Sequence, residues 1–344
     1  MTPTPGEVGR VSRLGIISGT GTARKRTLPA LRGSADCRVT VVQGRDADRL
    51  AEIRTVDPSI VLVTDLESFA NLRDRYDVVY IASPPFLHAD HVELAAALGK
   101  PILCEKPLVT DLAGAARVSG ALARSPVPFV LAHHVRHQPA VARLRALLRS
   151  GELGELSSGS LQWSFWMNHD APSARWKLDP DLAGPNALFD AGAHAIDLAL
   201  HLVGPPRRVA GWGAHVRSPR TMDAVTASLD YGRFVLTVVA SQSASPDGND
   251  LSLTFERGAV RVPGLLSERS ARSLELAADG SWTTETFAPV DLYRAEVEDF
   301  CRAPGGRGGH VGTTLEEAIT AVRVLCSVQE SIRSSGVPVD VQAD

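Results

Sequence analysis

Residues 80–107 read YIASPPFLHADHVELAAALGKPILCEKP, and this stretch decides the fold. It contains most of an apolar run, VVYIAS at 78–83, then a helical pattern over 88–99, then a second apolar run, PILCE at 101–105. A helix that joins two short apolar strands is the connection that parallel strands require. Ser83 and Lys106 therefore lie at the carboxyl ends of parallel strands, where open α/β sheets bind their ligands.

The same alternation of strands and helices extends to both sides of this stretch. Further strands are expected at RLGIIS (13–18), RVTVVQ (38–43) and PFVLAHH (128–134). Further helices are expected at TLPALRG (27–33), ADRLAEIR (47–54) and TDLAGAARVSGALAR (110–124). The pattern predicts an α/β domain with a doubly wound parallel sheet, a Rossmann domain, over residues 13–134, after an N-terminal tail of residues 1–12.

From about residue 152 the sequence changes to alternating runs that are typical of antiparallel strands. These runs are LSSGSLQWSFW (156–166), RVAGWGAHVRS (208–218), AVTASLDYG (224–232), RFVLTVVASQSAS (233–245) and DLSLTFERGAVRV (250–262). Two closing helices are expected at 292–303 and 313–335, the second started by Thr313 or Thr314. We therefore predict an α+β domain with a large open, mostly antiparallel sheet over residues 135–344.

The composition excludes several classes of protein. The chain has 344 residues, 44% hydrophobic and 22% charged, with a net charge of −3, which is typical of a soluble protein of about two domains. Such a charge does not attract nucleic acid, and no apolar run approaches the ~20 residues of a membrane span. Because MTPTPGEVGRVSR lacks the apolar segment of a signal peptide, we expect a cytoplasmic protein without membrane or nucleic-acid partners.

Neither the cysteines nor the clustered histidines indicate a metal site. Four scattered cysteines without a CxxC pair argue against a disulfide scaffold and a structural zinc. His133, His134 and His137 form an H-H-x-x-H run, but the exit of a strand should point His133 and His134 to opposite sides, whereas zinc needs converging ligands. We expect no metal, and we expect one of these histidines and Arg136 to line the substrate pocket.

A glycine-containing turn, SGTGTARKRTLPAL at 18–31, follows the first expected strand. Such a turn brings backbone amides to a pyrophosphate at the N-terminus of the next helix. Two registers fit a three-glycine pattern, and we favour the one with Ser18, Thr20 and Ala23 over the one with Gly19, Gly21 and Arg24; a purely structural turn is the alternative. Ser18 and Thr20 should then have ordinary backbone angles. The predicted cofactor contacts are Ser18, Gly19, Thr20, Gly21, Thr22 and Ala23.

The second expected strand ends in VVQGRDADRL (41–50), which bears on the choice of cofactor. An acid usually meets the free ribose hydroxyls of NAD at this point, but Gly44 and Arg45 stand here. A small residue followed by a planar cation favours the 2′-phosphate of NADP. NAD stays open, because Asp46 is two residues away, and a solvent-exposed Arg45 without a ligand is the other alternative.

A polar stripe lies on an otherwise apolar helical segment, LFDAGAHAIDLALH at 188–201. Asp190, His194, Asp197 and His201 follow at spacings of four, three and four, so they share one face of a helix. A solvated face is the plain interpretation. Because the other positions are nearly all apolar, however, these side chains are also candidates for a buried functional site.

Several of these motifs together resemble the Gfo/Idh/MocA family of NAD(P)-dependent oxidoreductases, and the likeness extends through nearly the whole chain. The motifs are IASPPFLHADH (81–91), CEKP (104–107), RHQPAVARLRALLRSGELGEL (136–156), RWKLDPDLAG (175–184) and LFDAGAHAIDLALHLVG (188–204). The resemblance implies hydride transfer between a nicotinamide cofactor and a carbinol or ketone carbon of a sugar, sugar nucleotide or inositol. It also implies a homodimer or homotetramer that assembles through the open sheet of the second domain.

The resemblance carries over residue by residue to Lys106, Asp190 and His194 as catalytic and substrate-binding residues. His194 would exchange the hydroxyl proton, Asp190 would orient it or a substrate hydroxyl, and Lys106 would stabilise the alkoxide. Asp197 would either support His194 or pair with an arginine, and His201 would be structural.

Further residues are predicted on the same basis. Arg136, Trp176 and Lys177 are expected to contact substrate, and Asn186 to cap the following helix. The tryptophans are expected in the core or in an interface, with stacking on a sugar ring as the alternative for Trp166 or Trp176. The remaining predicted cofactor contacts are Ser83, Pro84, His88, Glu105 and Lys106.

We therefore expect an NADP-preferring oxidoreductase that acts on a carbohydrate or cyclitol. Two alternatives stay open: a glycoside hydrolase that oxidises its substrate transiently with tightly held NAD, and a cofactor-binding regulator without chemistry.

Overall fold

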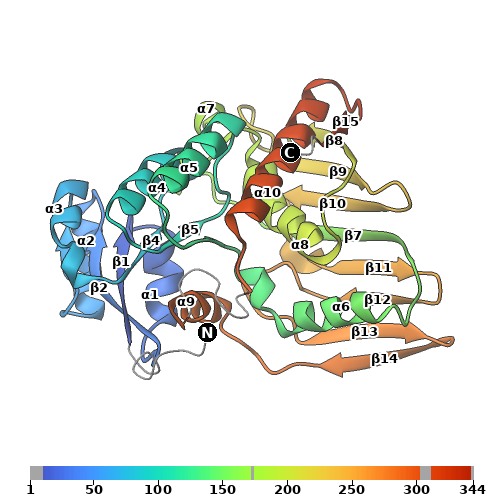
Figure 1. Cartoon of the computed structure of the whole chain (residues 1–344). Coiled ribbons are helices and arrows are strands. Elements are labelled where there is room, and N and C mark those ends of the chain that lie inside the picture. The colour runs from blue at the N-terminus through green and yellow to red at the C-terminus, as the bar shows by residue number, and fades with distance from the viewer. Residues whose placement is uncertain (1–10, 172–173, 303–310, 342–344) are drawn as a thin grey trace. The chain divides into compact units, whose positions relative to one another are not determined.

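The computed structural model of the chain describes residues 11–171, 174–302 and 311–341 (Figure 1). Most of the expected N-terminal tail, and the last residue of the expected helix at 292–303, lie outside these ranges. The chain divides into two compact units. Unit 1 comprises Met1–Leu108, Ala113–Ala132 and Tyr293–Leu315, and unit 2 comprises Val109–Leu112, His133–Leu292 and Glu316–Asp344.

Unit 1 contains a sheet of six parallel strands in the order β3-β2-β1-β4-β5-β6. The strands are β1 (Ser12–Ile17), β2 (Cys37–Gln43), β3 (Val61–Val63), β4 (Val78–Ile81), β5 (Ile102–Glu105) and β6 (Phe129–Ala132). This is the predicted doubly wound sheet, with β3 as an additional short strand. The strand order reverses between β1 and β4, and ligands of open α/β sheets bind at the carboxyl ends of the strands at such a point.

The helices of unit 1 follow from local sequence signals. They are the π-helical turn η1 (Ala23–Thr27) with α1 (Leu28–Ala30), then α2 (Ala47–Val56), α3 (Leu66–Asn71), α4 (His88–Ala97), α5 (Leu112–Arg124) and α9 (Leu292–Arg302). Asp46 and Asp65 cap α2 and α3, because each carboxylate accepts a backbone N–H of the first turn.

Helix α9 differs from the predicted domain division, which placed it in the second domain. Its residues Val297 and Phe300 belong to the same hydrophobic core as Leu14 of β1. Arg294 Nε also donates to the carbonyl oxygen of Ala30, at 2.6 Å. The apolar face of α9 is thus buried in unit 1, although the helix follows the strands of unit 2 in the sequence.

Unit 2 contains a nine-stranded sheet in the order β14-β13-β12-β11-β7-β10-β9-β8-β15. Its strands are β7 (Leu156–Ser164), β8 (Arg208–Ala214), β9 (Ala224–Asp230), β10 (Val235–Ser241), β11 (Leu251–Phe255), β12 (Gly258–Val262), β13 (Ser273–Ala278), β14 (Ser281–Thr286) and β15 (Val339–Asp340). Strand β7 pairs parallel with β10 and antiparallel with β11, and the other pairs are antiparallel. The predicted open, mostly antiparallel sheet is confirmed, with β7 in its middle and β13 to β15 as further strands.

The core of unit 2 lies on one face of this sheet. Buried side chains alternate along the strands, as in the pattern of Leu236, Val238 and Ala240 on β10. They pack with apolar residues of α6 (Pro139–Ser150), α8 (Ala193–Val203) and α10 (Leu315–Arg333), the helices that Figure 1 shows beside these strands. Residues on the other face are more exposed, and Trp212 is one of them.

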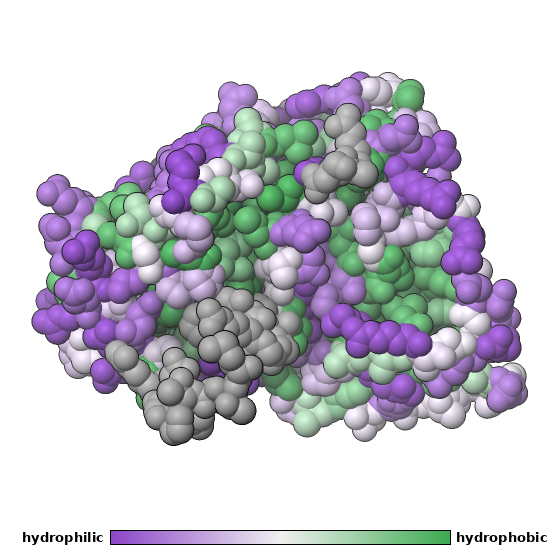
Figure 2. Space-filling view, viewed as in Figure 1, coloured by the Kyte–Doolittle hydropathy of each residue, from purple (hydrophilic) through white to green (hydrophobic). Residues whose placement is uncertain are grey.

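The surface of unit 2 changes in character from its rim inward. Figure 2 shows hydrophilic residues (purple) along the outer border near the ends of β10, β7 and β11, and hydrophobic residues (green) inside this border. Within the described part of the chain, no helix combines the length and the apolar character needed to cross a bilayer.

Candidate active site

The turn after β1 is held by the end of β2. The amide of Ser18 donates to Gln43 Oε1 at 3.1 Å, the amide of Gly19 donates to the Gln43 carbonyl at 2.8 Å, and Gln43 Nε2 donates to the Thr64 carbonyl at 3.2 Å. Ser18 has a φ of 58°, in the left-handed region that few non-glycine residues adopt. The prediction of an ordinary backbone at Ser18 is therefore wrong, and the buried Gln43 side chain supports this conformation.

The glycines of the turn serve two different needs. A Cβ on Gly19 would lie 2.4 Å from Val42 Cγ1, so only glycine allows the turn to approach β2. A Cβ on Gly21 would meet no atom within 4 Å, so the space above that residue is open. Ala23 is fully buried where the helical segment begins, and Thr22 provides no side-chain cap. An open turn before an uncapped helix N-terminus fits a pyrophosphate.

Asp46 and Arg45, which follow β2, have different surroundings. The Asp46 carboxylate accepts the amide of Arg49 at 3.1 Å and pairs with its guanidinium at 3.1 Å. It is therefore used as the cap of α2. Gly44 lies so close to the glycine turn that a Cβ would be 2.6 Å from Thr20 Cγ2. The side chain of Arg45, next to this contact, is exposed.

Two histidines of α4 hold the residues at the ends of β4 and β5. His88 is completely buried; its Nδ1 lies 3.0 and 2.9 Å from the carbonyl oxygens of Pro107 and Leu108, and its Nε2 lies 2.8 Å from that of Ser83. The predicted cofactor contact of His88 is thus corrected, because both ring nitrogens face the protein backbone. His88 instead ties α4 to the segment after Lys106.

Ser83 is positioned by the second of these histidines. His91 Nδ1 lies 2.9 Å from Ser83 Oγ. Burial, and then the neighbouring His88, lower the pKa of His91 to about 4. His91 is therefore neutral near pH 7. Ser83 and Pro84, which follow β4 at the reversal of strand order, remain predicted cofactor contacts.

Glu105 anchors the backbone at Lys106. Tyr80 donates its hydroxyl to Glu105 Oε1 at 2.5 Å and accepts the Thr27 hydroxyl at 3.3 Å, while Glu105 Oε2 accepts the amide of Lys106 at 3.3 Å. Burial, and then the charge of Glu105, raise the pKa of Tyr80 well above its usual value, so Tyr80 remains a donor. Lys106 precedes a cis peptide bond to Pro107 and is partly exposed. The contacts of Glu105 support a positioning role, and its cofactor contact stays a prediction.

In unit 2, Asp190 is fixed by two partners that the sequence places far apart. Lys177 Nζ lies 2.5 Å from Asp190 Oδ2, and Gln242 Nε2 donates to the same oxygen at 3.0 Å. Asn186 in turn donates to Gln242 Oε1 at 2.7 Å. The predicted cap by Asn186 is wrong, since the helical turn η6 (Leu188–Gly192) has Ala187 at its N-cap and no side-chain cap. Asp190 and Lys177, both predicted to contact substrate, are brought together.

His194 is held in an aromatic cluster. Its ring stacks on the indole of Trp163, with centroids 4.0 Å apart and planes at 11°, and only 4% of the residue is exposed. The rings of His134 and His133 meet it edge-on, with centroids at 5.0 and 5.7 Å. The prediction that His133 and His134 point to opposite sides is wrong, because β6 ends at Ala132 and a 3-10 turn begins at His134, which ends the alternation of a strand.

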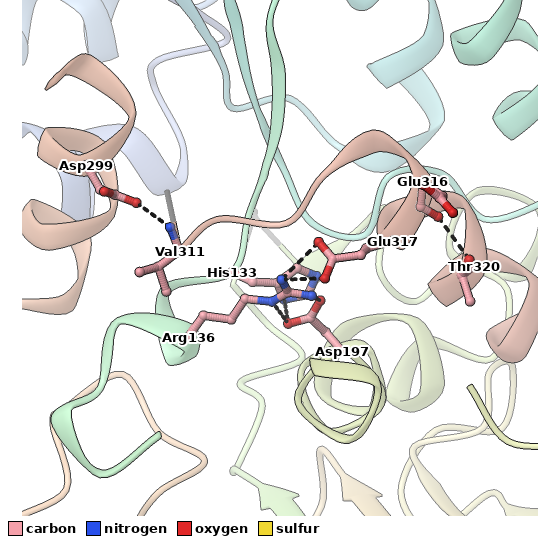
Figure 3. A network of polar contacts seen from close by, with 8 residues as sticks. All are labelled: His133, Arg136, Asp197, Asp299, Val311, Glu316, Glu317 and Thr320. Carbon is pink, nitrogen blue, oxygen red and sulfur yellow. Dashed lines mark hydrogen bonds and ion pairs between the residues drawn. The ribbon is translucent and has the colours of Figure 1, made fainter. Parts of the chain in front are cut away.

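Asp197 forms a buried ion pair one helical turn after His194 (Figure 3). The Arg136 guanidinium donates to both carboxylate oxygens at 2.7 and 2.9 Å and also to Glu317 at 3.1 and 3.2 Å, while His133 Nδ1 lies 3.6 Å from Asp197. Burial alone would raise the pKa of Asp197, but Arg136 and His133 lower it below its usual value. Arg136 is 3% exposed and committed to these carboxylates, so its predicted substrate contact is corrected.

The polar stripe of α8 is therefore not a solvated face. Asp197 and His194 are buried, as required for a functional or structural network. Burial, and then the charges of Arg136 and Arg145, lower the pKa of His201 to about 4, which supports the predicted structural role.

Sequence reasoning missed three residues that organise these contacts and gave Asn186 a different role. Gln43, Trp163 and Gln242 carry no local signature of a site, because each acts through a partner that is distant in the sequence. Trp176, a predicted substrate residue, has the ammonium of Lys177 5.6 Å from its ring centroid. Within the described ranges, no group of three or more His, Cys, Asp or Glu side chains is arranged so that it could hold a metal ion.

Comparison with known families and proteins identifies relatives of the chain. Residues 13–133 match the oxidoreductase family with an NAD-binding Rossmann fold, and residues 141–261 match the GFO/IDH/MocA C-terminal domain. The chain is 30% identical over 321 residues to D-xylose 1-dehydrogenase (NADP(+)) 2 of Haloferax volcanii, covering 92% of this chain and 96% of the relative. It is 32% identical over 300 residues to dTDP-3,4-didehydro-2,6-dideoxy-alpha-D-glucose 3-reductase of Streptomyces antibioticus, covering 85% and 83%.

Solved structures show the same fold at lower identity. The aldose-aldose oxidoreductase of Caulobacter crescentus superposes with a TM-score of 0.85 at 18% identity, covering 96% of this chain and 100% of that one. A 3-ketoreductase of Actinomadura kijaniata, solved with NADP and TDP-benzene, superposes with a TM-score of 0.82 at 20% identity, covering 94% and 98%.

Proposed function

The chain belongs to the GFO/IDH/MocA family of oxidoreductases, and from this premise we propose that it transfers a hydride between NADP(H) and a secondary alcohol or ketone carbon of a sugar, a sugar nucleotide or a cyclitol. Relatives with 23–32% sequence identity to the chain are named as an NADP-dependent xylose dehydrogenase, a dTDP-sugar 3-reductase and an NADP-dependent scyllo-inositol 2-dehydrogenase. Each of these names is that of a dehydrogenase or a reductase of a sugar, a sugar nucleotide or a cyclitol.

The observation that carries the proposal is the fixed pair of Asp190 and His194. Asp190 is held by Lys177 at 2.5 Å and by Gln242 at 3.0 Å, and His194 is stacked on Trp163. Both side chains are polar groups on a largely buried, apolar helical segment, where a purely structural role would favour apolar residues. Because the His194 ring is almost enclosed, only a small part of it contacts a ligand.

In the oxidation direction, the three predicted catalytic side chains have different tasks. His194 accepts the hydroxyl proton as the carbinol carbon loses its hydride, so the carbon becomes a carbonyl carbon and the imidazole becomes an imidazolium. The Lys106 ammonium stabilises the alkoxide that develops on the oxygen, and Asp190 orients a neighbouring hydroxyl. The nicotinamide, when bound, supplies the acceptor for the hydride. Reduction uses the same groups in reverse.

The sequence around β2 supports NADP over NAD. Gly44 allows the end of β2 to approach the glycine turn closely, Arg45 offers an exposed planar cation, and Asp46 is engaged as a helix cap. An arginine in this place suits a 2′-phosphate, whereas NAD favours an acid that accepts the ribose hydroxyls.

We also propose that the protein acts as a homodimer or homotetramer in the cytoplasm, assembled through the exposed face of the nine-stranded sheet. Trp212 and Val235 are exposed on this face, and exposed large apolar side chains favour association. Light scattering of the purified protein tests this proposal, and a monomer at micromolar concentration would contradict it.

The function is tested by nicotinamide absorbance with aldoses, inositols and nucleotide-linked keto-sugars, each with NAD(H) and NADP(H). We expect turnover with at least one of these sugars, and Lys106→Ala and His194→Ala should each lower kcat by ~100-fold or more. Their affinity for the dinucleotide, measured by titration, should stay within a few fold of the parent. A variant that keeps full turnover would disprove the role of that side chain.

A further inference from the structure

A cation and an exposed indole are stacked beside the Asp190 network in unit 2. The guanidinium carbon of Arg217 lies 3.7 Å from the ring centroid of Trp166, and Arg217 Nη1 donates to the carbonyl oxygen of Met167 at 3.0 Å. Trp166 is 62% exposed in spite of this contact. A guanidinium over an aromatic face is attracted by the ring, so the two side chains hold each other in place.

The loop that carries Arg217, residues 215–223 between β8 and β9, is built around one buried carboxylate. Asp223 accepts the amides of Val216, Arg217 and Ser218 at 2.6, 2.8 and 3.0 Å, and the hydroxyl of Ser243 at 2.6 Å. Burial would raise the pKa of Asp223, but these hydrogen bonds lower it below its usual value. The ionised carboxylate therefore fixes the backbone at Arg217 before any ligand arrives.

The same loop is joined to the residues that position Asp190. Thr221 Oγ1 donates to the Gly184 carbonyl at 2.8 Å and accepts the amide of Asn186 at 3.1 Å. On the other side, the amide of Met167 donates to the carbonyl of Gln242 at 2.9 Å, and Gln242 donates to Asp190. Arg217 and Asp190 are thus connected through adjacent residues of one hydrogen-bonded network.

Arg217 differs from other arginines of unit 2 in the groups that its guanidinium contacts. Arg143 and Arg208 each form an ion pair with a carboxylate, Glu285 and Asp230. Within the described ranges, by contrast, the guanidinium of Arg217 has no carboxylate at ion-pair distance, and its contacts are a carbonyl oxygen and an aromatic ring. A planar cation that is oriented but not neutralised is suited to an anionic ligand.

We propose that Arg217 and Trp166 form a subsite for the nucleoside diphosphate part of a nucleotide-linked sugar, an assignment that rests on the proposed sugar oxidoreductase function. The guanidinium matches the oxygens of a phosphate group, and the exposed indole provides a stacking surface for the base. A small sugar acid would use the cation and leave the indole uncovered. The subsite thus selects the substrate by its nucleoside diphosphate part, which takes no part in the hydride transfer.

The test measures binding of thymidine diphosphate to the full-length protein by calorimetry with saturating NADP, so that the dinucleotide site is already filled. We expect Arg217→Gln to weaken this binding by roughly 10- to 100-fold, the loss of one or two charged hydrogen bonds. Glucose 1-phosphate should bind more weakly than thymidine diphosphate, and Trp166→Leu should weaken only thymidine diphosphate. Because both side chains are partly exposed, these variants should keep the melting temperature of the parent.

Arg261→Gln is the matched control, because Arg261 also stacks on an exposed indole, that of Trp282, at 4.7 Å, but has no described link to Asp190. It should leave binding unchanged. The proposal is overturned if thymidine diphosphate does not bind the parent, if it binds Arg217→Gln equally well, or if glucuronate binds as tightly as thymidine diphosphate. Because this test does not depend on turnover, the absence of activity on every sugar would instead contradict the proposed function.

Discussion

The buried ion pair of Arg136 and Asp197 makes a quantitative prediction about stability. In Arg136→Met the guanidinium is lost and a side chain of similar length fills its place, so that Asp197 stays buried without its two hydrogen bonds of 2.7 and 2.9 Å. His133, at 3.6 Å, is then its nearest described basic neighbour. The variant therefore tests whether this arginine acts in the fold or on a substrate.

The expected loss is set by the buried charge that remains. Removing one partner of a buried pair costs about 3–5 kcal/mol, because the other charge is left in a poorly polarisable interior. Loss of the contact with Glu317 adds little to this change in the free energy of unfolding, since the Glu317 side chain is 39% exposed and screened by water. Against a typical unfolding free energy of about 5–15 kcal/mol, the variant should lose about a fifth or more of its stability.

The sign of the pH dependence separates this mechanism from a simple packing defect. In the parent, the pKa of Asp197 lies below its usual 3.8, so its contribution to stability is present above that pH and is lost only as the pH falls lower. In Arg136→Met, burial without the cation should raise this pKa above 3.8. The folded variant then takes up a proton before the unfolded chain does, so its stability deficit should shrink as the pH is lowered toward about 4.

Urea unfolding followed by tryptophan fluorescence measures this loss in the right part of the molecule. All five tryptophans have sequence numbers within unit 2, and urea carries no charge that would screen the pair. The double variant Arg136→Met/Asp197→Leu is the control, and it should recover most of the loss. A loss below about 1 kcal/mol in the single variant, or a double variant whose loss equals the sum of the two single ones, would refute the reasoning.

Three further predictions concern the cofactor turn, the buried histidines and the aromatic cluster. Arg45→Ala should raise the KM for NADP by about 10-fold or more and leave that for NAD within about two-fold, and equal effects would reject the phosphate contact. The pKa of His91 is lowered to about 4 in the folded protein. As the pH falls below 6.5, His91 is therefore protonated in the unfolded chain before it is protonated in the folded one. The free energy of unfolding of the parent should therefore fall by up to about 3 kcal/mol between pH 6.5 and 4. In His91→Gln, unfolding followed by circular dichroism should show a weaker dependence of this free energy on pH, and an unchanged dependence contradicts the prediction. Trp163→Leu should lower kcat about 10-fold and leave the affinity for the dinucleotide unchanged, with partial recovery of kcat in Trp163→Phe, because the stacked ring orients His194. If kcat of Trp163→Leu equals that of the parent, Trp163 only packs.

Local patterns in the sequence were sufficient for the architecture. Short apolar runs placed the parallel strands of unit 1, which are buried on both faces. The 2.0 and 3.6 periods placed most strands of unit 2 and the helices, because these periods arise from burial on one face of an element. The CEKP motif and the D-x-x-x-H spacing likewise identified Lys106, Asp190 and His194 as candidates within single short segments. Such features depend on neighbours along the chain, which the sequence shows directly.

The errors occurred where a property depends on residues that are distant along the chain. The predicted direction of the His133 and His134 rings was wrong because β6 ends at Ala132, two residues before the end of the expected strand at 128–134. The left-handed conformation of Ser18 is accepted because Gln43, on another strand, satisfies its amide. Helix α9 buries its apolar face in unit 1 although it follows the strands of unit 2 in the sequence.

By itself, the sequence determined the two-domain α/β architecture, the family and the residue types available for hydride-transfer chemistry, because these follow from periodicity and from short motifs. Only the tertiary structure decided which side chains contact each other. Gln242 and Lys177 bind Asp190, and Trp163 stacks on His194. Arg136 pairs with Asp197 instead of contacting a substrate. The physical reason is that the charge and orientation of a buried polar side chain are set by the groups that replace its water, and long-range packing selects those groups.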